Sequence, residues 1–269
     1  MHTKPRRHGR GIFVPAQSGT ADSRQRPVRT LGPLMTDLKL LYDSMYADAA
    51  PLIRAGACSA DPHLDAPDDN RCGLTLLLRP PVKIQEAFRR FQEAALDASP
   101  GLYLHPASDL HVTVLAIVSC REGFRLDGID VAAYERLVRA CLEGIAPFVL
   151  RFRGITASAA AVMACGYPEG DALEQVRGRL RKAFRATSLD QSIDTRYVLQ
   201  SAHATLLRFP EQPRNAPALA RVLEQHRNTD FGCWRCGEME LVFNDWYQRA
   251  NRVQRLASFR LERTRGGPG

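Results

Sequence analysis

The chain has 269 residues, of which 45% are hydrophobic and 25% are charged. This composition is ordinary for a globular protein, and the length suits one large domain or two small lobes. No apolar run approaches the ~18 residues of a transmembrane helix, and the basic N-terminus lacks the apolar segment of a signal peptide. We therefore expect a cytoplasmic protein, monomeric and without a membrane partner.

The net charge of +8 is concentrated at the N-terminus. Residues 1–30 carry seven basic residues and one acidic residue, so they contribute +6 and the other residues only +2. The pI therefore supports a polyanionic partner only weakly. We predict that residues 1–32, which are rich in Arg, Pro, Gly and Ser, form a disordered basic tail, with a nucleic-acid-binding arm as the alternative.

Helical and strand-like segments alternate over the rest of the chain. Apolar spacing predicts a helix over residues 34–50 that Pro51 helps to end, followed by an Asp-rich loop over 57–72 that fits no calcium-binding spacing. We group residues 33–72 as an N-terminal helix and loop extension. Further helices are predicted over residues 82–97, 129–144, 171–186 and 215–226. Strands are predicted over residues 74–78, 102–104, 110–118, 147–154, 159–165, 196–209, 229–234, 237–243 and 254–261.

Two of the predicted strands carry the same short motif. One contains His111 and Thr113, and the other contains His203 and Thr205, each pair separated by one apolar residue. Residues two apart share a strand face, so each strand offers an imidazole beside a hydroxyl. A single pair would mean little, but two pairs in matching contexts are a much stronger signal.

The segments around the two motifs have the same organisation. In each, a strand (residues 74–78 or 161–165) is followed by a helix and then by the motif strand. This repetition predicts an α+β fold of two duplicated lobes, with mostly antiparallel sheets and outer helices. A pseudo-twofold relation would bring both motifs to one central cleft. We assign this bilobed domain to residues 73–265.

Two facing His-Thr pairs can catalyse an in-line displacement at a phosphodiester. Imidazole titrates near neutral pH, so one histidine can act as a base and the other as an acid. The threonine hydroxyls can donate hydrogen bonds to the phosphate oxygens, where charge develops. Neither histidine has a second histidine or a carboxylate cluster at ligand spacing, so we predict no metal and no cofactor.

The tandem sequences His-Val-Thr-Val (residues 111–114) and His-Ala-Thr-Leu (residues 203–206) resemble the two signatures of the 2H phosphoesterase superfamily. Among its members they are most similar to the bacterial RNA 2′,3′-cyclic phosphodiesterases, also called 2′-5′ RNA ligases. The resemblance covers about residues 73–262. It implies two lobes around a groove, and hydrolysis of 2′,3′-cyclic phosphates on RNA 3′ ends or nucleotides, or 2′-5′ joining of RNA ends, without a metal.

The resemblance also implies roles for the motif residues. His111 and His203 would be the acid/base pair, and Thr113 and Thr205 would bind the phosphate. We assign His203 as the base that activates water and His111 as the acid that protonates the leaving ribose oxygen. The reverse assignment is the alternative, because a symmetric site can run either way. The superfamily also includes enzymes for other cyclic nucleotides and for 2′-5′ oligoadenylates, so the motif does not identify the substrate.

Three further residues are candidate substrate contacts. Arg208 has strand parity opposite to that of His203, which favours a structural or surface role over a phosphate or ribose contact. Trp246 and Tyr247 lie in a polar turn, where they either pack onto the neighbouring lobe or stack on a base. We assign His105, which precedes the turn into the first motif strand, to the surface, with a place at the mouth of the cleft as the alternative.

Two other classes of protein are alternatives. A non-catalytic RNA- or nucleotide-binding module would retain the cleft, but the nearly neutral folded part lacks the Lys/Arg excess that binds phosphates. A zinc or redox protein would use Cys233 and Cys236. Zinc would need a second pair of ligands and a redox pair would need a helix N-terminus, so we interpret the seven cysteines as reduced thiols.

Overall fold

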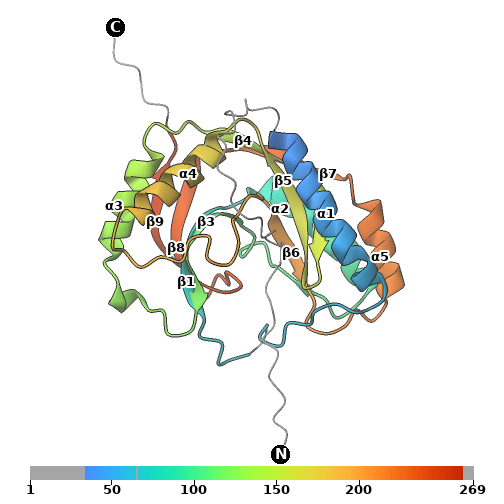
Figure 1. Cartoon of the computed structure of the whole chain (residues 1–269). Helices are drawn as coiled ribbons and strands as arrows, with labels where there is room; N and C mark the ends of the chain where they lie inside the picture. Colours follow the sequence, from blue (N-terminus) through green and yellow to red (C-terminus); the bar gives the residue numbers. More distant parts are fainter. Residues whose placement is uncertain (1–33, 65, 263–269) are drawn as a thin grey trace, which may run out of the picture.

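The computed structural model describes residues 34–262 except residue 65 (Figure 1). The predicted basic tail, residues 1–32, lies outside the described residues. Among the helices that the structure describes, none is long and apolar enough to cross a membrane.

The helices and strands alternate along the chain much as predicted. The helices are α1 (Leu34–Arg54), α2 (Val82–Ala98), α3 (Val131–Leu142), α4 (Ala172–Arg185) and α5 (Ala216–Gln225), with a short 3₁₀ helix at Leu126–Gly128. The strands are β1 (Cys72–Leu78), β2 (Tyr103–Leu104), β3 (Val112–Arg121), β4 (Phe148–Ser158), β5 (Ala161–Pro168), β6 (Ala204–Arg208), β7 (Asp230–Cys236), β8 (Glu238–Asp245) and β9 (Gln254–Arg260).

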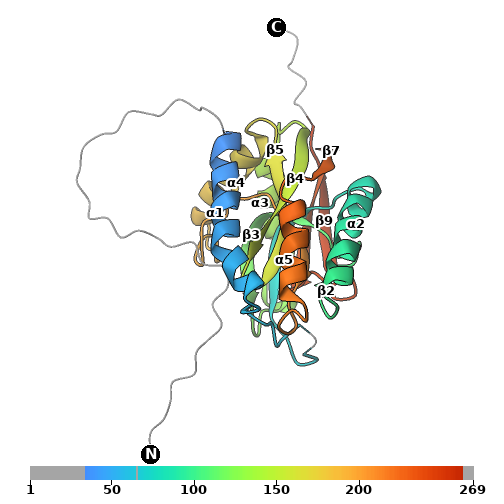
Figure 2. The same ribbon diagram turned by 90° about the vertical axis from the view of Figure 1, so that its right-hand side faces the viewer.

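The strands form two antiparallel sheets. One sheet has the order β3-β1-β8-β9, and the other has the order β2-β6-β5-β4-β7. Helices α3 and α4 pack together beside the first sheet, α1 and α2 pack on the second, and α5 packs against α1 and α2 (Figures 1 and 2). The prediction of an α+β fold with antiparallel sheets and outer helices is confirmed.

The two halves of the fold exchange their helices. Helix α2 follows β1 but packs on β6 and β7 of the other sheet, whereas α4 follows β5 but packs on β3 and α3. In both halves the strand before the helix pairs with the motif strand after it, β1 with β3 and β5 with β6. The same strand-helix-strand unit therefore occurs twice, with the same exchange.

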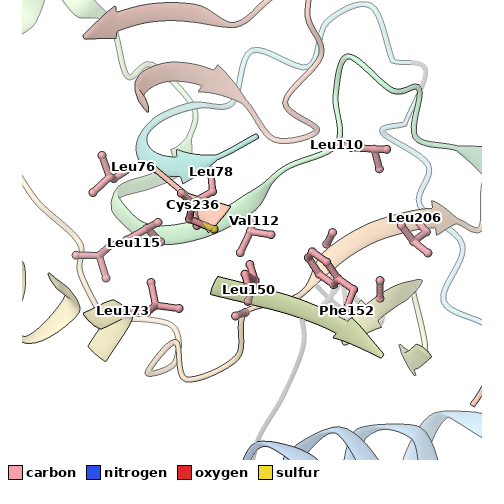
Figure 3. Close-up of a cluster of buried hydrophobic side chains, with 14 of the residues drawn as sticks. Leu76, Leu78, Leu110, Val112, Leu115, Leu150, Phe152, Leu173, Leu206 and Cys236 are labelled. Carbon is pink, nitrogen blue, oxygen red and sulfur yellow. The ribbon is translucent and has the colours of Figure 1, made fainter. Parts of the chain in front are cut away.

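One hydrophobic core joins the two sheets (Figure 3). Leu76 and Val112 from the first sheet and Leu150, Phe152 and Leu206 from the second are all fully buried in it. Each large apolar side chain contributes roughly 1.5–3 kcal/mol by leaving water. Because side chains alternate along a strand, this burial directs the neighbouring polar residues of β3 and β6 to the opposite face.

Helix α1 continues past Pro51 to Arg54, so the prediction that Pro51 helps to end it is wrong. Proline removes one N–H group from the helical ladder, which normally favours an end at that point. Here the following turn buries Ile53 completely, and the Ala55 amide still bonds to the Pro51 carbonyl oxygen. Tertiary packing of the last turn therefore outweighs the local signal.

The second motif strand is shorter than predicted, because β6 begins at Ala204 and residues 196–203 are irregular. Buried side chains bond part of this segment's backbone. Arg177 donates to the carbonyl oxygens of Gln200 and Ser201, and the Tyr42 hydroxyl accepts from the Ala202 amide. These bonds take the place of the ladder of hydrogen bonds in a strand. A sequence pattern cannot distinguish a segment held in this way from a strand.

Candidate active site

Each motif histidine is the residue immediately before its strand. His111 precedes β3 and His203 precedes β6, and both are half-buried. The two strands belong to different sheets but contact each other. The charge of His203 lowers the pKa of His111, so the two imidazoles lie within electrostatic reach of one another. The fold therefore brings both motifs to one place.

The two rings are oriented by different hydrogen-bond partners. Nδ1 of His111 lies 2.8 Å from the carbonyl oxygen of Asp109. A carbonyl oxygen only accepts, so Nδ1 carries the proton and Nε2 is left to face a reactant. Nδ1 of His203 lies 2.7 Å from Oγ of Ser201, which can accept or donate. Neither Nε2 has a hydrogen-bond partner among the described residues.

Burial lowers the pKa of both histidines to about 4. For His111 the bond to Asp109 opposes this effect, and the charges of His203 and Arg208 add to it. For His203 the charges of Arg177 and Arg208 add to it. Both imidazoles are therefore neutral near pH 7 in the free protein. An anion bound between them would favour protonation of one.

The two motif threonines lie on the same strand face as their histidines. Thr113 and Thr205 are both half-buried. No other described residue hydrogen-bonds to either hydroxyl, although the neighbouring backbone groups are paired in the sheets. Two hydroxyl donors are therefore available beside the two imidazoles.

A β-bulge brings Arg208 to the same face as the second motif. Thr205 and Leu207 pair with consecutive residues of β5, so Leu206 is an extra residue in β6. A bulge of one residue reverses the alternation of side chains beyond it. Arg208 therefore shares the face of Thr205, and its charge lowers the pKa of His203. The parity argument that placed Arg208 away from the site is wrong.

The first motif strand has the same bulge but no arginine. Thr113 and Leu115 pair with consecutive residues of β1, so Val114 is the extra residue there. The position equivalent to Arg208 is thus Ala116, three residues after Thr113, as Arg208 follows Thr205. The site contains two similar acid/base motifs but a single motif arginine, which makes it chemically asymmetric.

Arg208 is held in a polar environment with unused hydrogen-bonding capacity. Its Nη1 lies 3.9 Å from Oδ2 of Asp61, and its guanidinium lies 5.4 Å from the ring centre of Tyr247. Its buried Nε–H has no partner among the described residues. A buried donor without a partner is costly, so a ligand oxygen here would be favoured.

The two candidate aromatic residues differ in exposure. Tyr247 is only 1% exposed, and its hydroxyl donates to Asp61 at 2.9 Å, so it packs between the lobes and presents no free face to a base. Trp246 is half-buried, with the guanidinium groups of Arg71 and Arg196 at 4.6 and 4.9 Å from its ring centre. Of this pair, only Trp246 is partly exposed.

His105 is buried, at 2% exposure, so its assignment to the surface is wrong. Its amide bonds to the carbonyl oxygen of Leu206, and this bond extends β2 alongside β6. Its own carbonyl oxygen accepts from Gln92. Burial holds the pKa of His105 well below its usual value, and the charges of Arg208 and His111 lower it further. His105 therefore lies neutral behind the motif residues.

Sequence reasoning missed Arg177, Ser201 and Tyr42. Arg177 stands one helical turn after Leu173, on the buried side of α4, and an arginine at a position spaced like the apolar residues of a helix is a detectable signal. Ser201 precedes His203 by two residues, as Asp109 precedes His111. Tyr42 carried no comparable signal, because its partners lie more than 100 residues away along the chain.

Cys233 is exposed and Cys236 is buried, as expected for residues three apart on strand β7. All seven cysteines of the chain lie in the described residues and are free thiols. Within the same residues, no group of three or more His, Cys, Asp and Glu side chains gathers at metal-binding distance. The Cys233–Cys236 pair therefore gives no geometric support to a zinc or redox site.

Two exchanged α+β halves, each placing a His-x-Thr motif at the contact between the sheets, define a protein of the 2H phosphoesterase class. The family model described as the 2′-5′ RNA ligase superfamily matches residues 80–245. The match runs from just after β1 to the end of β8 and covers more than half of the chain. The chain belongs to the 2′-5′ RNA ligase superfamily, and the predicted kinship with LigT-like 2H phosphoesterases is confirmed.

Solved structures resemble this chain at low sequence identity. A conserved protein of unknown function from Agrobacterium tumefaciens has a TM-score of 0.50 at 17% identity, covering 77% of this chain and 97% of that one. TT0787 of Thermus thermophilus has a TM-score of 0.49 at 20% identity, covering 71% of this chain and 99% of that one. E. coli LigT complexed with 3′-AMP has a TM-score of 0.47 at 17% identity, covering 71% of this chain and 98% of that one. No curated protein sequence matches the chain significantly.

Proposed function

We propose that the protein is a metal-independent phosphodiesterase that hydrolyses 2′,3′-cyclic phosphates, on RNA 3′ ends or on nucleotides. The observation that supports this most is the pairing of His111 and His203. Each ring is oriented through Nδ1, each Nε2 is without a partner in the described chain, and each has a free threonine hydroxyl beside it. This set supplies an acid, a base and two phosphate donors.

The reaction is an in-line displacement at phosphorus. Nε2 of His203 accepts a proton from water as the water oxygen bonds to phosphorus. Nε2–H of His111 donates its proton to the ribose oxygen as the bond from phosphorus to that oxygen breaks. The product is an acyclic phosphomonoester with one free ribose hydroxyl. Thr113, Thr205 and Arg208 donate to the non-bridging oxygens, where negative charge increases in the transition state.

The local environments favour this division of roles. The Asp109 carbonyl oxygen accepts from Nδ1 of His111 and so stabilises its protonated form, which an acid needs. The charge of Arg177 lowers the pKa of His203 but is not among the causes that lower the pKa of His111, which favours the neutral form that a base needs. After the reaction the proton rests on His203, and exchange with solvent returns both rings to their starting states.

The same acid/base pair can serve a joining reaction and its reverse. In joining, a 5′-hydroxyl attacks the phosphorus in place of water and the ribose 3′ oxygen leaves, which forms a 2′-5′ bond. In the reverse reaction the 3′-hydroxyl attacks the phosphorus and the 5′ oxygen leaves. Joining RNA ends through a 2′-5′ bond, or cleaving such a bond in an oligonucleotide, is therefore an alternative use of the site. Product analysis with an RNA carrying both end groups distinguishes these uses from hydrolysis.

The test is hydrolysis of the four nucleoside 2′,3′-cyclic phosphates in excess EDTA, with wild type beside His111→Ala and His203→Ala. We expect turnover that survives chelation and falls ~10²–10⁴-fold in each variant, as for positioned acid/base groups. His63→Ala is the matched control, because this histidine lies exposed in a loop. Full activity in both site variants would refute the proposal, and cyclic-phosphate binding without turnover would favour a binding module.

A further inference from the structure

Arg177 is the largest fully buried side chain of the described chain, with 0% exposure. It extends from α4, and each of its five N–H groups has an acceptor. One of them donates to Glu174 at 2.9 Å. The other four donate to the backbone carbonyl oxygens of Val114 (2.9 Å), Thr113 (3.3 Å), Gln200 (2.9 Å) and Ser201 (2.6 Å).

These four carbonyl oxygens belong to the two motif segments. Thr113 is the threonine of the first motif, and Ser201 provides the hydroxyl that contacts Nδ1 of His203. Strands β3 and β6 are in different sheets and share no ladder of hydrogen bonds. The single guanidinium therefore provides a hydrogen-bonded connection between the two motifs that the backbone does not supply.

We propose that Arg177 is a positioning residue, whose guanidinium sets the distance and mutual orientation of His111 and His203 by holding the backbone of both motifs. The inference rests on the function proposed above. Arg177 does not touch the reacting atoms. It acts through the carbonyl oxygens it holds, and an error of about 1 Å in such geometry can lower a rate about 10²-fold.

The four bonds to carbonyl oxygens also stabilise the fold, and they distinguish Arg177 from a buried ion pair, which an apolar side chain of similar volume can often replace without loss of stability. The partner of Arg177, Glu174, is 40% exposed in its side chain, so the buried cation is compensated mainly by carbonyl dipoles. An arginine in this place is thus better explained by the forked geometry that it imposes on two segments at once.

Arg177 also acts by charge, and on one histidine more than on the other. The groups that face His203 are Ser201 on its own segment, Arg208 of β6, Arg177 of α4 and, across the sheets, His111. After burial, the charge of Arg177 is the next cause that lowers the pKa of His203, whereas it is not among the causes for His111. The effect of the Arg177 charge and the effect of its hydrogen bonds to both motifs can therefore be separated by substitution.

Two substitutions make this separation. Arg177→Lys keeps the cation but cannot reach four carbonyl oxygens, and Arg177→Met removes both the cation and the donors. Arg179→Lys is the matched control. It lies on the same helix and also donates to two backbone carbonyl oxygens, of Cys141 and Glu143, which are remote from the motifs.

The experiment measures kcat and KM for a nucleoside 2′,3′-cyclic phosphate and titrates both imidazoles by NMR, on variants shown to be folded by circular dichroism. We expect Arg177→Lys to lower kcat about 10²-fold with little change in KM, and Arg179→Lys to retain wild-type values. We expect Arg177→Met to raise the pKa of His203 and to leave that of His111 nearly unchanged. Wild-type kcat in folded Arg177→Lys would overturn the inference.

A second readout keeps this inference separate from the proposed reaction. Inorganic phosphate is added to each protein and the imidazole signals of His111 and His203 are followed. We expect both signals to shift together in wild type and Arg179→Lys, and to lose this joint response in Arg177→Lys. If both signals shift together in Arg177→Lys, at the same phosphate concentration as in wild type, the positioning role is wrong. Absence of turnover in wild type, with the joint response lost in Arg177→Lys, would refute the reaction and retain Arg177 as the connection.

Discussion

The segments that precede His111 and His203 carry the same motif but are held in different ways. The first is anchored by its own loop and by the turn between β8 and β9. The Asp109 carbonyl oxygen orients the ring, and the Asp109 carboxylate accepts from Ser108 and from the Ala250 amide. The second depends on residues distant in sequence, because its backbone bonds to Arg177 of α4 and Tyr42 of α1.

The second segment also packs closely on strand β5. A Cβ atom on Gly166 would lie 1.9 Å from the Ala202 carbonyl oxygen, so only glycine permits this approach. The Tyr42 hydroxyl donates to the Gly166 carbonyl oxygen at 3.0 Å and accepts from the Ala202 amide at 2.9 Å. Helix α1 lies before the matched family region, residues 80–245. The two copies of the motif are thus held by different contacts, and the charges around their histidines differ as well.

The largest expected effect concerns pH. Burial lowers the pKa of both histidines to about 4, and the reaction needs one protonated and one neutral ring. Above about pH 5 the protonated fraction of the free protein falls roughly tenfold per pH unit, so kcat/KM should fall from pH 5 to pH 8. The bound anion raises these pKa values, so kcat should begin to decline at higher pH than kcat/KM.

Steady-state kinetics across this range measure both profiles, and NMR titration with phosphate bound resolves the two rings. If the two segments differ as described, His111 takes up its proton at higher pH than His203, because only the Asp109 carbonyl oxygen is an obligate acceptor. A kcat/KM that rises from pH 5 to pH 8, or identical titration of both rings, would contradict the comparison.

The next effect concerns the single motif arginine. Arg208→Ala should lower kcat/KM about 10²-fold, since it removes a donor aimed at the developing charge. Adding Ala116→Arg to this variant moves the guanidinium to the equivalent place on the first motif. We expect little recovery, because a cation there would disfavour protonation of His111 instead of keeping His203 neutral.

The kinetic constants of the single and double variants measure this effect. Arg214→Ala is the control, because Arg214 is exposed and pairs with Glu211. Recovery to near wild-type activity in the double variant would show that the two motifs are interchangeable, and the proposed asymmetry would be wrong.

The smallest effect concerns the support from α1. Tyr42→Phe leaves the buried Ala202 amide without its acceptor, which should lower the free energy of unfolding by about 1–3 kcal/mol. Activity should fall only a few fold, since Arg177 still holds the segment. Urea denaturation and kcat measure the two effects.

Tyr46→Phe provides the matched control. Tyr46 lies one turn further along α1, and its hydroxyl donates to Glu224 at 3.0 Å in an exposed position. Its loss should change the free energy of unfolding by less than about 0.5 kcal/mol, as for most surface substitutions. Equal losses of stability in the two variants would contradict the support that we assign to Tyr42.

Much of the fold could be predicted because its signals are local. Apolar periodicity located α2, α4 and the buried strands β1 and β5 to within a few residues, and turn residues separated them. The repeated strand-helix-strand order also indicated two similar halves. The exchange of α2 and α4 between the sheets was not predictable, because hydrophobic spacing shows that a helix has a partner but not which sheet it covers.

The two His-x-Thr motifs are visible in the sequence, and the face that each histidine shares with its threonine could be predicted, since it follows from strand geometry over three residues. The place of Arg208, the burial of His105 and the link through Arg177 depend instead on how distant segments pack. Arg208 turns to the site because of a bulge that only the register against β5 reveals. Arg177 meets the first motif across 63 residues of chain, and contacts at such separation depend on packing rather than on local pattern.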